Sequence, residues 1–247
     1  MRIRHILTSF LLILTSIALS ATEDESYHFV SGEFQPFTSE QMTNGGLTTE
    51  IIQSVVENMG KTMKVSYLPW KRGHLKTLNG DFYAIYPYSK NPERLKIWHY
   101  SEALYELEEI FFRLKGKTFD YTSNSDLQGL TVCKPTGYNL FGLKKLFEEG
   151  LIKLERPPDL KSCFRMLNIG RVDLVMTNAT TAWSMIDSLG LDAAKFDQVD
   201  KPFEKINHHL IIPKSNLSGK SFLKGFNDVL TRLKAEGKVQ NILDKHL

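Results

Sequence analysis

The sequence predicts an α/β protein built from two similar units. Its composition is that of an ordinary globular chain, with 247 residues of which 42% are hydrophobic and 24% charged. Strand-like apolar runs alternate with segments whose apolar residues repeat at helical spacing. This alternation occurs twice, with starting points about 100 residues apart, and it is typical of a parallel sheet covered by helices.

The N-terminus has the layout of a secretory signal peptide. A basic start at Met1–His5 leads into the apolar stretch Ile6–Leu19, and the acidic, polar run Thr22–Ser26 follows. The apolar stretch spans about 14 residues, which is short of the ~20 that a membrane-spanning helix needs. We therefore expect residues 1–21 to be removed and the mature chain to be periplasmic and not membrane-embedded.

Charge and cysteine content exclude two further classes. Loss of Arg2 and Arg4 with the signal peptide leaves 29 basic against 28 acidic residues, so the mature chain lacks the basic footprint of a nucleic-acid binder. Two cysteines are too few for a disulfide-built scaffold. The chain is long enough to fold on a hydrophobic core.

The first unit follows the order strand, helix, strand, helix, strand. Its first helix places Ile51, Val55 and Met59 on one apolar face, and Gly60 ends it. The predicted strands cover 27–31, 63–68 and 82–86, and the predicted helices cover 48–59 and 70–79.

The second unit repeats this order further along the chain. Its predicted strands cover 130–133, 152–154 and 172–176, and its helices cover 140–149 and 159–168. Strand-like segments at 109–114 and 209–212 flank the unit, where the chain can cross between lobes and return. A helical stretch over 222–247 closes the chain. We expect lobe 1 over 22–108 plus 205–247, and lobe 2 over 109–204.

Motifs of common catalytic and cofactor sites are absent from the sequence. There is no G-x-S-x-G nucleophile elbow and no G-x-G-x-x-G dinucleotide loop. The histidines show no H-x-x-x-H spacing, and there is no Cys-x-x-Cys. We expect no catalytic residues, no metal and no cofactor.

Several short motifs follow one another along nearly the whole mature chain. They are Phe34–Phe37, Gly45–Gly46, Pro69–Arg72, Ser89–Arg94 and Ser101, then Leu127–Leu130 with Gly137, and Leu167–Asp173. In order and spacing they resemble the family 3 extracellular solute-binding proteins, the amino-acid-binding proteins of ABC importers. The resemblance implies the type II periplasmic binding protein fold, with two α/β lobes joined by two crossing strands and the ligand cleft between them.

Arg94 and Ser89 are the main candidates for holding a ligand. An arginine offers a planar fork that can grip a carboxylate through two charge-assisted hydrogen bonds. Taken alone, an arginine after a strand reads as a solvated surface residue, and Ser89 as a turn residue. The resemblance implies that Arg94 binds the carboxylate of the ligand and that Ser89 donates a hydrogen bond to it.

Aromatic residues lie where the predicted strands of the first unit end. Phe34 and Trp70 follow the first and second strands, and Tyr86 and Tyr88 flank the end of the third. Ligands bind at this carboxyl edge in open α/β sheets. We expect these rings to form a wall of the ligand site, with packing inside the lobe as the alternative.

The second unit supplies a turn and an amide. Gly137, Tyr138 and Asn139 precede a predicted helix, whose free N–H groups can bind an anion and which Asn139 can also cap. In many amino-acid binders of the family, an acid after the last strand of this unit takes the ammonium of the ligand. That place falls at Asn178, which carries no charge, so the resemblance leaves the identity of the ligand open, and Asp187 is a possible substitute.

Cys133 and Cys163 are a candidate disulfide. Cys133 ends the first strand of the second unit, and Cys163 lies early in the helix after the second strand. Strand ends and the starts of following helices share one edge of a parallel sheet, and disulfides persist in exported proteins. The alternative is two buried, unpaired thiols.

We expect a monomeric solute-binding protein that captures a small carboxylated solute and delivers it to an ABC permease. A sensor that passes its bound state to a membrane receptor needs the same ligand-gated closure. A dehydratase-type enzyme on the same fold would need a titratable group in the cleft, and only Glu33 and His74 lie near the predicted site.

Overall fold

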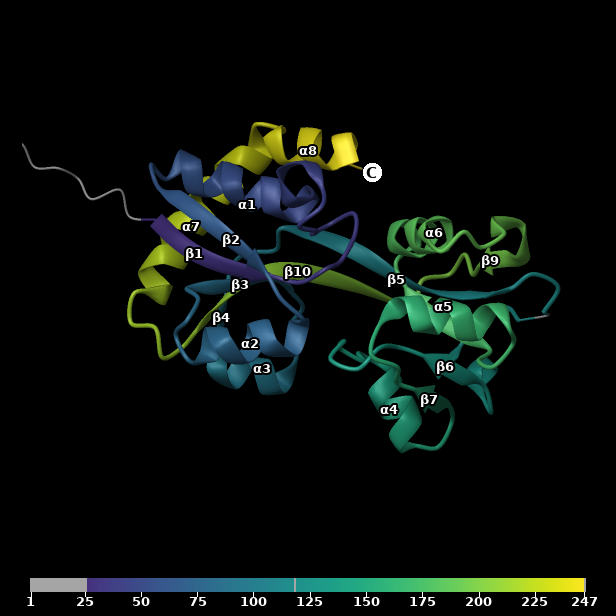
Figure 1. The fold of residues 1–247 in the computed structure, drawn as a ribbon. Coiled ribbons are helices and arrows are strands. Elements are labelled where there is room, and N and C mark those ends of the chain that lie inside the picture. The colour runs from purple at the N-terminus through teal and green to yellow at the C-terminus, as the bar shows by residue number, and fades with distance from the viewer. Residues whose placement is uncertain (1–25, 118, 247) are drawn as a thin grey trace, which may run out of the picture.

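The computed structural model describes residues 26–117 and 119–246. The strands and helices form two α/β lobes, and β5 (Tyr105–Leu114) and β10 (Glu204–Pro213) run side by side between them (Figure 1). This is the expected two-lobe architecture with two crossing strands. The predicted signal peptide lies outside the described residues, and none of the helices within them is long and apolar enough to cross a membrane.

Lobe 1 is a sheet with helices on both faces. Along the sheet the strand order is β2-β1-β3-β10, in which β1 pairs in parallel with β2 and β3 while β10 runs antiparallel to β3. Helices α1, α7 and α8 cover one face, and α2 and α3 lie on the other (Figure 1). The elements are β1 (Ser26–Ser31), α1 (Leu47–Asn58), β2 (Thr62–Tyr67), α2 (Trp70–Leu78), β3 (Ala84–Tyr88), α3 (Pro92–Ile97), β4 (Trp98–Tyr100), α7 (Gly219–Ala235) and α8 (Lys238–His246).

Helix α1 shows how sequence pattern becomes packing in this lobe. Its apolar residues Ile51 and Val55 are fully buried in the core that α1 forms with α7 and the sheet. Gly46 precedes the helix with a φ of 90°, and a Cβ there would lie 2.8 Å from the backbone oxygen of Phe37. Glycine is therefore the residue that this entry into the helix requires.

Glu50 ties α1 to the C-terminal helix α8. Its carboxylate accepts hydrogen bonds from Lys245 Nζ at 2.8 Å and from His246 Nε2 at 2.8 Å. Partial burial raises the pKa of Glu50, but the hydrogen bonds from Lys245, His246 and Asn44 outweigh it and hold the pKa at about 2. The ionised carboxylate thus stabilises the contact between α1 and α8.

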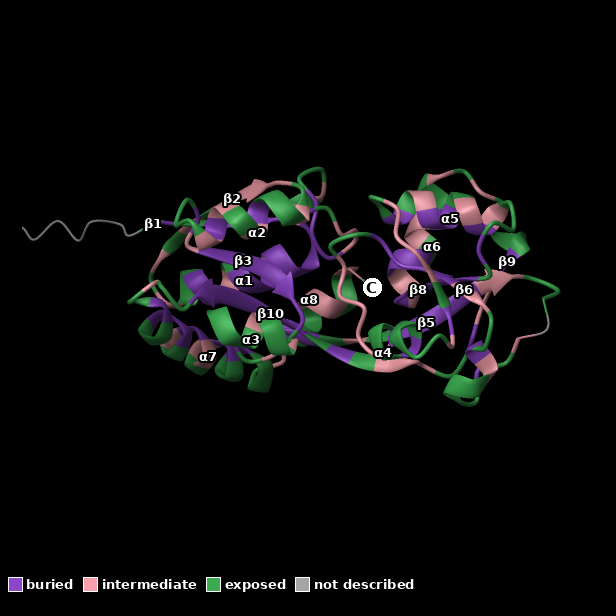
Figure 2. Cartoon of the chain, turned by 90° about the horizontal axis from the view of Figure 1, so that it is seen from below, coloured by how far each residue is buried: buried purple, intermediate pink, exposed green. Residues whose placement is uncertain are grey.

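Lobe 2 repeats the arrangement on a smaller scale. The sheet continues in the order β5-β8-β6-β7, with β6 parallel to β7 and β8 and with β5 antiparallel to β8. Two apolar clusters fill the two faces of this sheet. The helices of the lobe carry both buried and exposed residues (Figure 2). The elements are β6 (Thr131–Cys133), α4 (Leu143–Glu148), β7 (Lys153–Glu155), α5 (Leu160–Asn168), β8 (Leu174–Thr177), α6 (Ala179–Ser188) and β9 (Phe196–Gln198); short 3₁₀ turns cover Thr43–Gly45, Asn124–Leu127 and Ala193–Lys195.

Some predicted boundaries were wrong. The expected strand over 82–86 begins two residues later, at Ala84. The predicted helix over 140–149 begins only at Leu143, because Phe141 adopts a φ of 51° that a helix cannot contain. The expected C-terminal helix is two helices, since Gly237, with a φ of 72°, separates α7 from α8.

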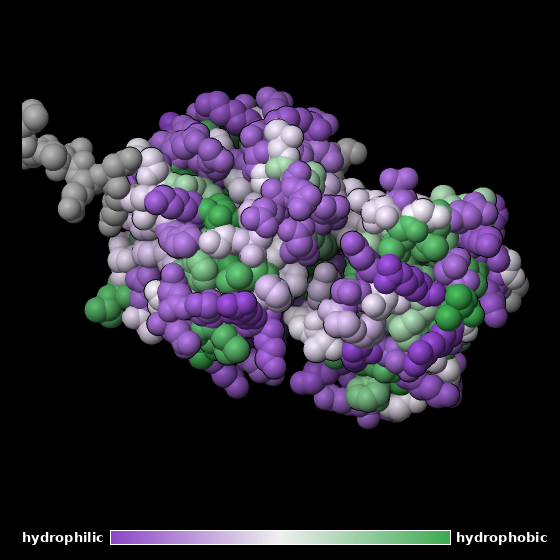
Figure 3. All heavy atoms as spheres, in the orientation of Figure 1, coloured by the Kyte–Doolittle hydropathy of each residue, from purple (hydrophilic) through white to green (hydrophobic). Residues whose placement is uncertain are grey.

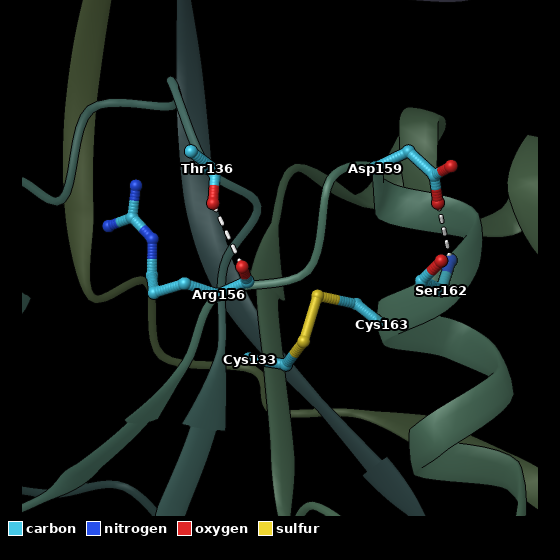
Figure 4. The surroundings of a disulfide bond; sticks show 6 residues. All are labelled: Cys133, Thr136, Arg156, Asp159, Ser162 and Cys163. Carbon is cyan, nitrogen blue, oxygen red and sulfur yellow. Dashed lines mark hydrogen bonds between the residues drawn. A yellow bond between two sulfur atoms is a disulfide. The ribbon is translucent and has the colours of Figure 1, made fainter.

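A disulfide joins β6 to α5. Cys133 and Cys163 have Sγ atoms 2.02 Å apart and Cα atoms 5.6 Å apart, and both residues are fully buried. Asp159 caps α5 just before the cysteine by accepting from Ser162 N at 2.7 Å (Figure 4). The bond anchors the end of β6 to α5. Lys134 is the residue that directly follows this anchored end.

Candidate ligand-binding site

A cavity of about 80 Å³ lies between the lobes. This is several times the ~10–15 Å³ that one water molecule requires. On the space-filling surface the two lobes are separate masses with a notch between them (Figure 3). The lining residues are Phe34, Trp70, Pro87, Tyr88, Ser89 and Arg94 from lobe 1, Lys134, Gly137, Tyr138, Asn139, Phe141 and Thr177 from lobe 2, and Glu109 and His208 from the crossing strands.

The start of helix α3 positions Arg94. Asn91 caps the helix by accepting from Arg94 N at 2.7 Å, and Pro92 occupies the first helical position. The guanidinium donates from Nη1 to the Ser89 carbonyl at 3.1 Å and lies 4.6 Å from the centre of the Tyr88 ring. These contacts orient the side chain, and within residues 26–117 and 119–246 its other guanidinium N–H donors form no hydrogen bond and can serve a carboxylate.

Aromatic rings form one wall of the cavity. Trp70 meets Tyr88 edge-on, with ring centres 5.7 Å apart, and Phe34 stacks near His208 at 6.2 Å. Gly32 makes room for the indole, because a Cβ at that position would lie 2.5 Å from Trp70 Cε2. The predicted aromatic wall is thus assembled from Phe34, Trp70 and Tyr88.

Asn139 connects the two lobes across the cavity. Its Nδ2 donates to Ser89 Oγ at 3.2 Å and lies 3.4 Å from the carbonyl of Lys90. A second link between the lobes runs from Thr181 Oγ1 on α6 to the Gln35 carbonyl at 3.3 Å. The lobes are therefore held together by side chains at the edge of the site.

A buried ion pair forms part of the cavity lining. Lys134 Nζ donates to Glu109 Oε2 at 2.5 Å, and their side chains are only 3% and 6% exposed. Lys134 directly follows β6, where the ring of Phe141 lies 5.4 Å from its ammonium. Charges this deeply buried are costly unless they are paired, so each depends on the other.

His208 lies beside this pair as a neutral ring. It stacks on Tyr105 with ring centres 5.3 Å apart, and its Nδ1 lies 3.2 Å from the Ile206 carbonyl. Burial lowers the pKa of His208 to about 3. Its neighbour His209 faces the other side of the strand, with Nδ1 2.8 Å from the Ser101 carbonyl.

The structure places Tyr86 away from the cavity, contrary to the sequence prediction. It is fully buried in the core of lobe 1, and its hydroxyl donates to Thr49 Oγ1 at 3.3 Å. The pairing of β3 with β10 shifts register between Ile85 and Tyr88. The extra residue turns Tyr88 to the face opposite Tyr86, so that Tyr88 alone reaches the cavity.

Asn178 differs from its expected position, and Asn139 differs from one of its two expected roles. Asn178 caps α6, accepting from Thr181 N at 2.9 Å and donating to Thr181 Oγ1 at 3.0 Å, so it is not among the residues that line the cavity. Asn139 does line the cavity but does not cap α4, whose cap position is Gly142. Its Oδ1 instead accepts from Phe141 N at 3.2 Å within the preceding turn.

Glu109 and Lys134 escaped sequence reasoning, although each carried a signal. Along β5, Glu106 and Glu108 point to solvent, while Glu109 falls on the opposite face with Tyr105 and Phe111. An acid on an otherwise apolar strand face requires a partner. Lys134, for its part, follows the carboxyl end of a parallel strand, where ligand-binding residues gather.

The titratable residues considered for an enzyme lie outside the cavity lining. Glu33 is exposed and accepts from Glu40 N at 3.1 Å. His74 packs between Tyr88 and Trp98, and burial, helped by the nearby Arg94, lowers its pKa. Within residues 26–117 and 119–246, no cluster of three histidine, cysteine or acidic side chains could hold a metal ion.

Several solved structures share this architecture. The fold matches the GluR0 ligand-binding core from Nostoc punctiforme in complex with L-glutamate (TM-score 0.73, 17% identity, covering 90% of this chain and 99% of that one). It also matches an ancestral arginine-binding protein bound to arginine (TM-score 0.75, 20% identity, 90% and 98%) and a histidine kinase sensor domain similar to periplasmic binding proteins (TM-score 0.75, 17% identity, 90% and 96%). At these identities the likeness shows the fold alone.

The sequence itself carries the family assignment. A search of the curated proteins finds no match. The family model of the bacterial extracellular solute-binding proteins, family 3, matches residues 29–247, which is nearly all of the chain that the structure describes. This protein therefore belongs to the family 3 bacterial extracellular solute-binding proteins.

Proposed function

We propose that this protein captures a small carboxylated solute, an amino acid or a related acid, and delivers it to an ABC permease in the inner membrane. The observation that carries the proposal is Arg94, whose guanidinium lines an interlobe cavity and forms a single hydrogen bond among the described residues. A solute carboxylate there forms two charge-assisted hydrogen bonds that are shielded from water.

The remaining lining residues have complementary roles in this proposal. Ser89 and Asn139 add polar contacts from opposite lobes, and they already touch one another across the cleft. Trp70 and Phe34 pack against the apolar part of the solute. Because both lobes contribute contacts, binding favours the closed arrangement, which is the hinge mechanism of two-lobe receptors.

The family and the predicted signal peptide both support export and action in the periplasm. We place the boundaries between the lobes at residues 108/109 and 204/205, where β5 and β10 cross. The receptor acts as a monomer and needs no cofactor, because solute capture requires only the contacts within the cavity and the motion of the lobes.

Calorimetry on the mature protein tests the capture function. A panel of amino acids and small organic acids first identifies a binder, and Arg94→Gln is then compared with Arg72→Gln, an exposed arginine on α2. Removing one partner of a desolvated charge pair costs about 2–5 kcal/mol, so we expect the Arg94 variant to bind at least ~30-fold more weakly. Equal affinity of the two variants would remove Arg94 from the site.

A sensor role is the second candidate, because the fold also matches a histidine kinase sensor domain. Both roles use the same closure, so binding measurements do not separate them. Deletion of the gene does: an importer receptor is required for uptake of the identified solute by intact cells. Normal uptake together with a lost transcriptional response to the solute would favour the sensor.

A further inference from the structure

Three charged side chains line the cavity between the lobes. Arg94 and Lys134 are cations and Glu109 is a carboxylate, so these groups leave one positive charge in excess. His208 adds no charge near neutral pH, because burial keeps its ring deprotonated. The balance of charge in the site is therefore set by these three groups.

The excess charge resides at Arg94. Glu109 and Lys134 neutralise one another at 2.5 Å, whereas no carboxylate of the described residues forms an ion pair with Arg94. A neutral amino acid, which brings one positive and one negative charge, leaves that excess in place. A cationic amino acid doubles it, and a solute of net charge −1 removes it. Uncompensated charge in a closed cavity is costly, so charge balance favours the anion.

Lys134 has capacity for a second acidic group. An ammonium carries three donors, and among the described residues that of Lys134 donates only to Glu109. Glu109 is the one carboxylate in the cavity lining, and it is placed to receive an amino group if the solute has one. An acidic amino acid thus finds a partner for each of its three charges.

A second compartment beside the cavity also carries an excess of positive charge. A larger compartment of about 470 Å³ adjoins the cavity and shares Arg94, Tyr138, Asn139 and Phe141 with it. Its charged lining residues are the cations Lys90, Arg94, Lys144 and Arg156 and the acids Glu93 and Glu204. Cations in excess along a cleft attract anions and speed their association.

We propose that the solute is an anion of net charge −1, such as an acidic amino acid, with one carboxylate at Arg94 and a second acidic group at Lys134. Lys134 is then the residue that selects an acid over its amide. This inference rests on the proposed capture of a small carboxylated solute, and it narrows the class of that solute.

Isothermal calorimetry with matched probes tests the inference on the native protein. The panel pairs glutamate with glutamine and aspartate with asparagine, and it adds alanine, arginine, lactate and succinate. We expect an anionic probe to bind about tenfold or more tightly than its amide or than any neutral or cationic probe. Tighter binding of a neutral or cationic amino acid would overturn the anion inference and leave the capture function intact. No binding by any probe would overturn both.

A charge-matched pair of variants tests the role of Lys134. Lys134→Gln removes the buried ammonium, and Lys153→Gln removes an exposed one on β7. We expect the preference for acid over amide to fall about tenfold in the first variant and to stay unchanged in the second. An unchanged preference in a folded Lys134→Gln protein would refute its selecting role. If this variant does not fold, the probe panel on the native protein still decides whether the solute is an anion.

Discussion

Breaking the Cys133–Cys163 bond is expected to destabilise lobe 2 strongly. The cysteines are 30 residues apart in sequence, and the chain-entropy model gives about 3.6 kcal/mol for a loop of that length. In a protein of this size each kcal/mol moves the unfolding temperature by roughly 2–4 °C, so the shift should be roughly 7–14 °C. Both residues are fully buried, so replacing them with alanine adds a packing loss to the loss of the crosslink.

Three samples distinguish the stability contributed by the crosslink from the stability contributed by packing of the two side chains. Differential scanning calorimetry compares the oxidised protein, protein refolded in reductant, and the Cys133→Ala/Cys163→Ala variant. The reduced protein keeps both sulfur atoms and loses only the bond, so its shift measures the crosslink alone. Equal unfolding temperatures for the oxidised and reduced proteins would refute the reasoning. Two free thiols in denatured, unreduced periplasmic protein would show that the bond does not form in the cell.

Three further predictions concern the aromatic wall of the cavity and the contact between α1 and α8. Tryptophan emission should respond to a bound solute, and this response should vanish in Trp70→Phe. It should persist in Trp98→Phe, because Trp98 is only 1% exposed. Gly32→Ala should weaken solute binding about tenfold in calorimetry, because its new Cβ would displace the Trp70 ring; unchanged affinity would contradict this. Glu50→Gln should lower the urea-unfolding free energy by about 1 kcal/mol at pH 7, since the carboxylate is partly solvated. Folding depresses the pKa of Glu50 from 4.5 to about 2, so this stability is present above pH 4.5 and is lost on acidification toward pH 2. If the variant and the wild type still differ in unfolding free energy near pH 2, the ion contacts of Glu50 are not the cause of the difference.

The architecture was predictable because it depends on local patterns. The helical spacing of Ile51 and Val55 and the repeated order of strand and helix fix which faces are apolar, and burial of those faces requires sheets covered by helices. The same logic brought Arg94 and Trp70 to the carboxyl edge of lobe 1, where the structure has them lining the cavity.

The boundaries were less predictable because single residues with unusual backbone conformations decide them. Phe141 delays α4, and the register shift beside Tyr88 separates that ring from Tyr86. Neither feature changes the spacing of apolar residues in the sequence, so that spacing does not reveal them.

The two-unit α/β organisation and the residues at each strand end follow from the sequence alone, as does the prediction of an export signal. Which of these residues line one cavity depends on how the two lobes pack. Glu109 lies on β5 and Lys134 directly follows β6, 25 residues further along the chain, yet their charges meet at 2.5 Å. Each residue is marked by its place on or after a strand, but nothing local shows that the two charges pair, because their pairing arises from burial between elements that only the folded chain brings together.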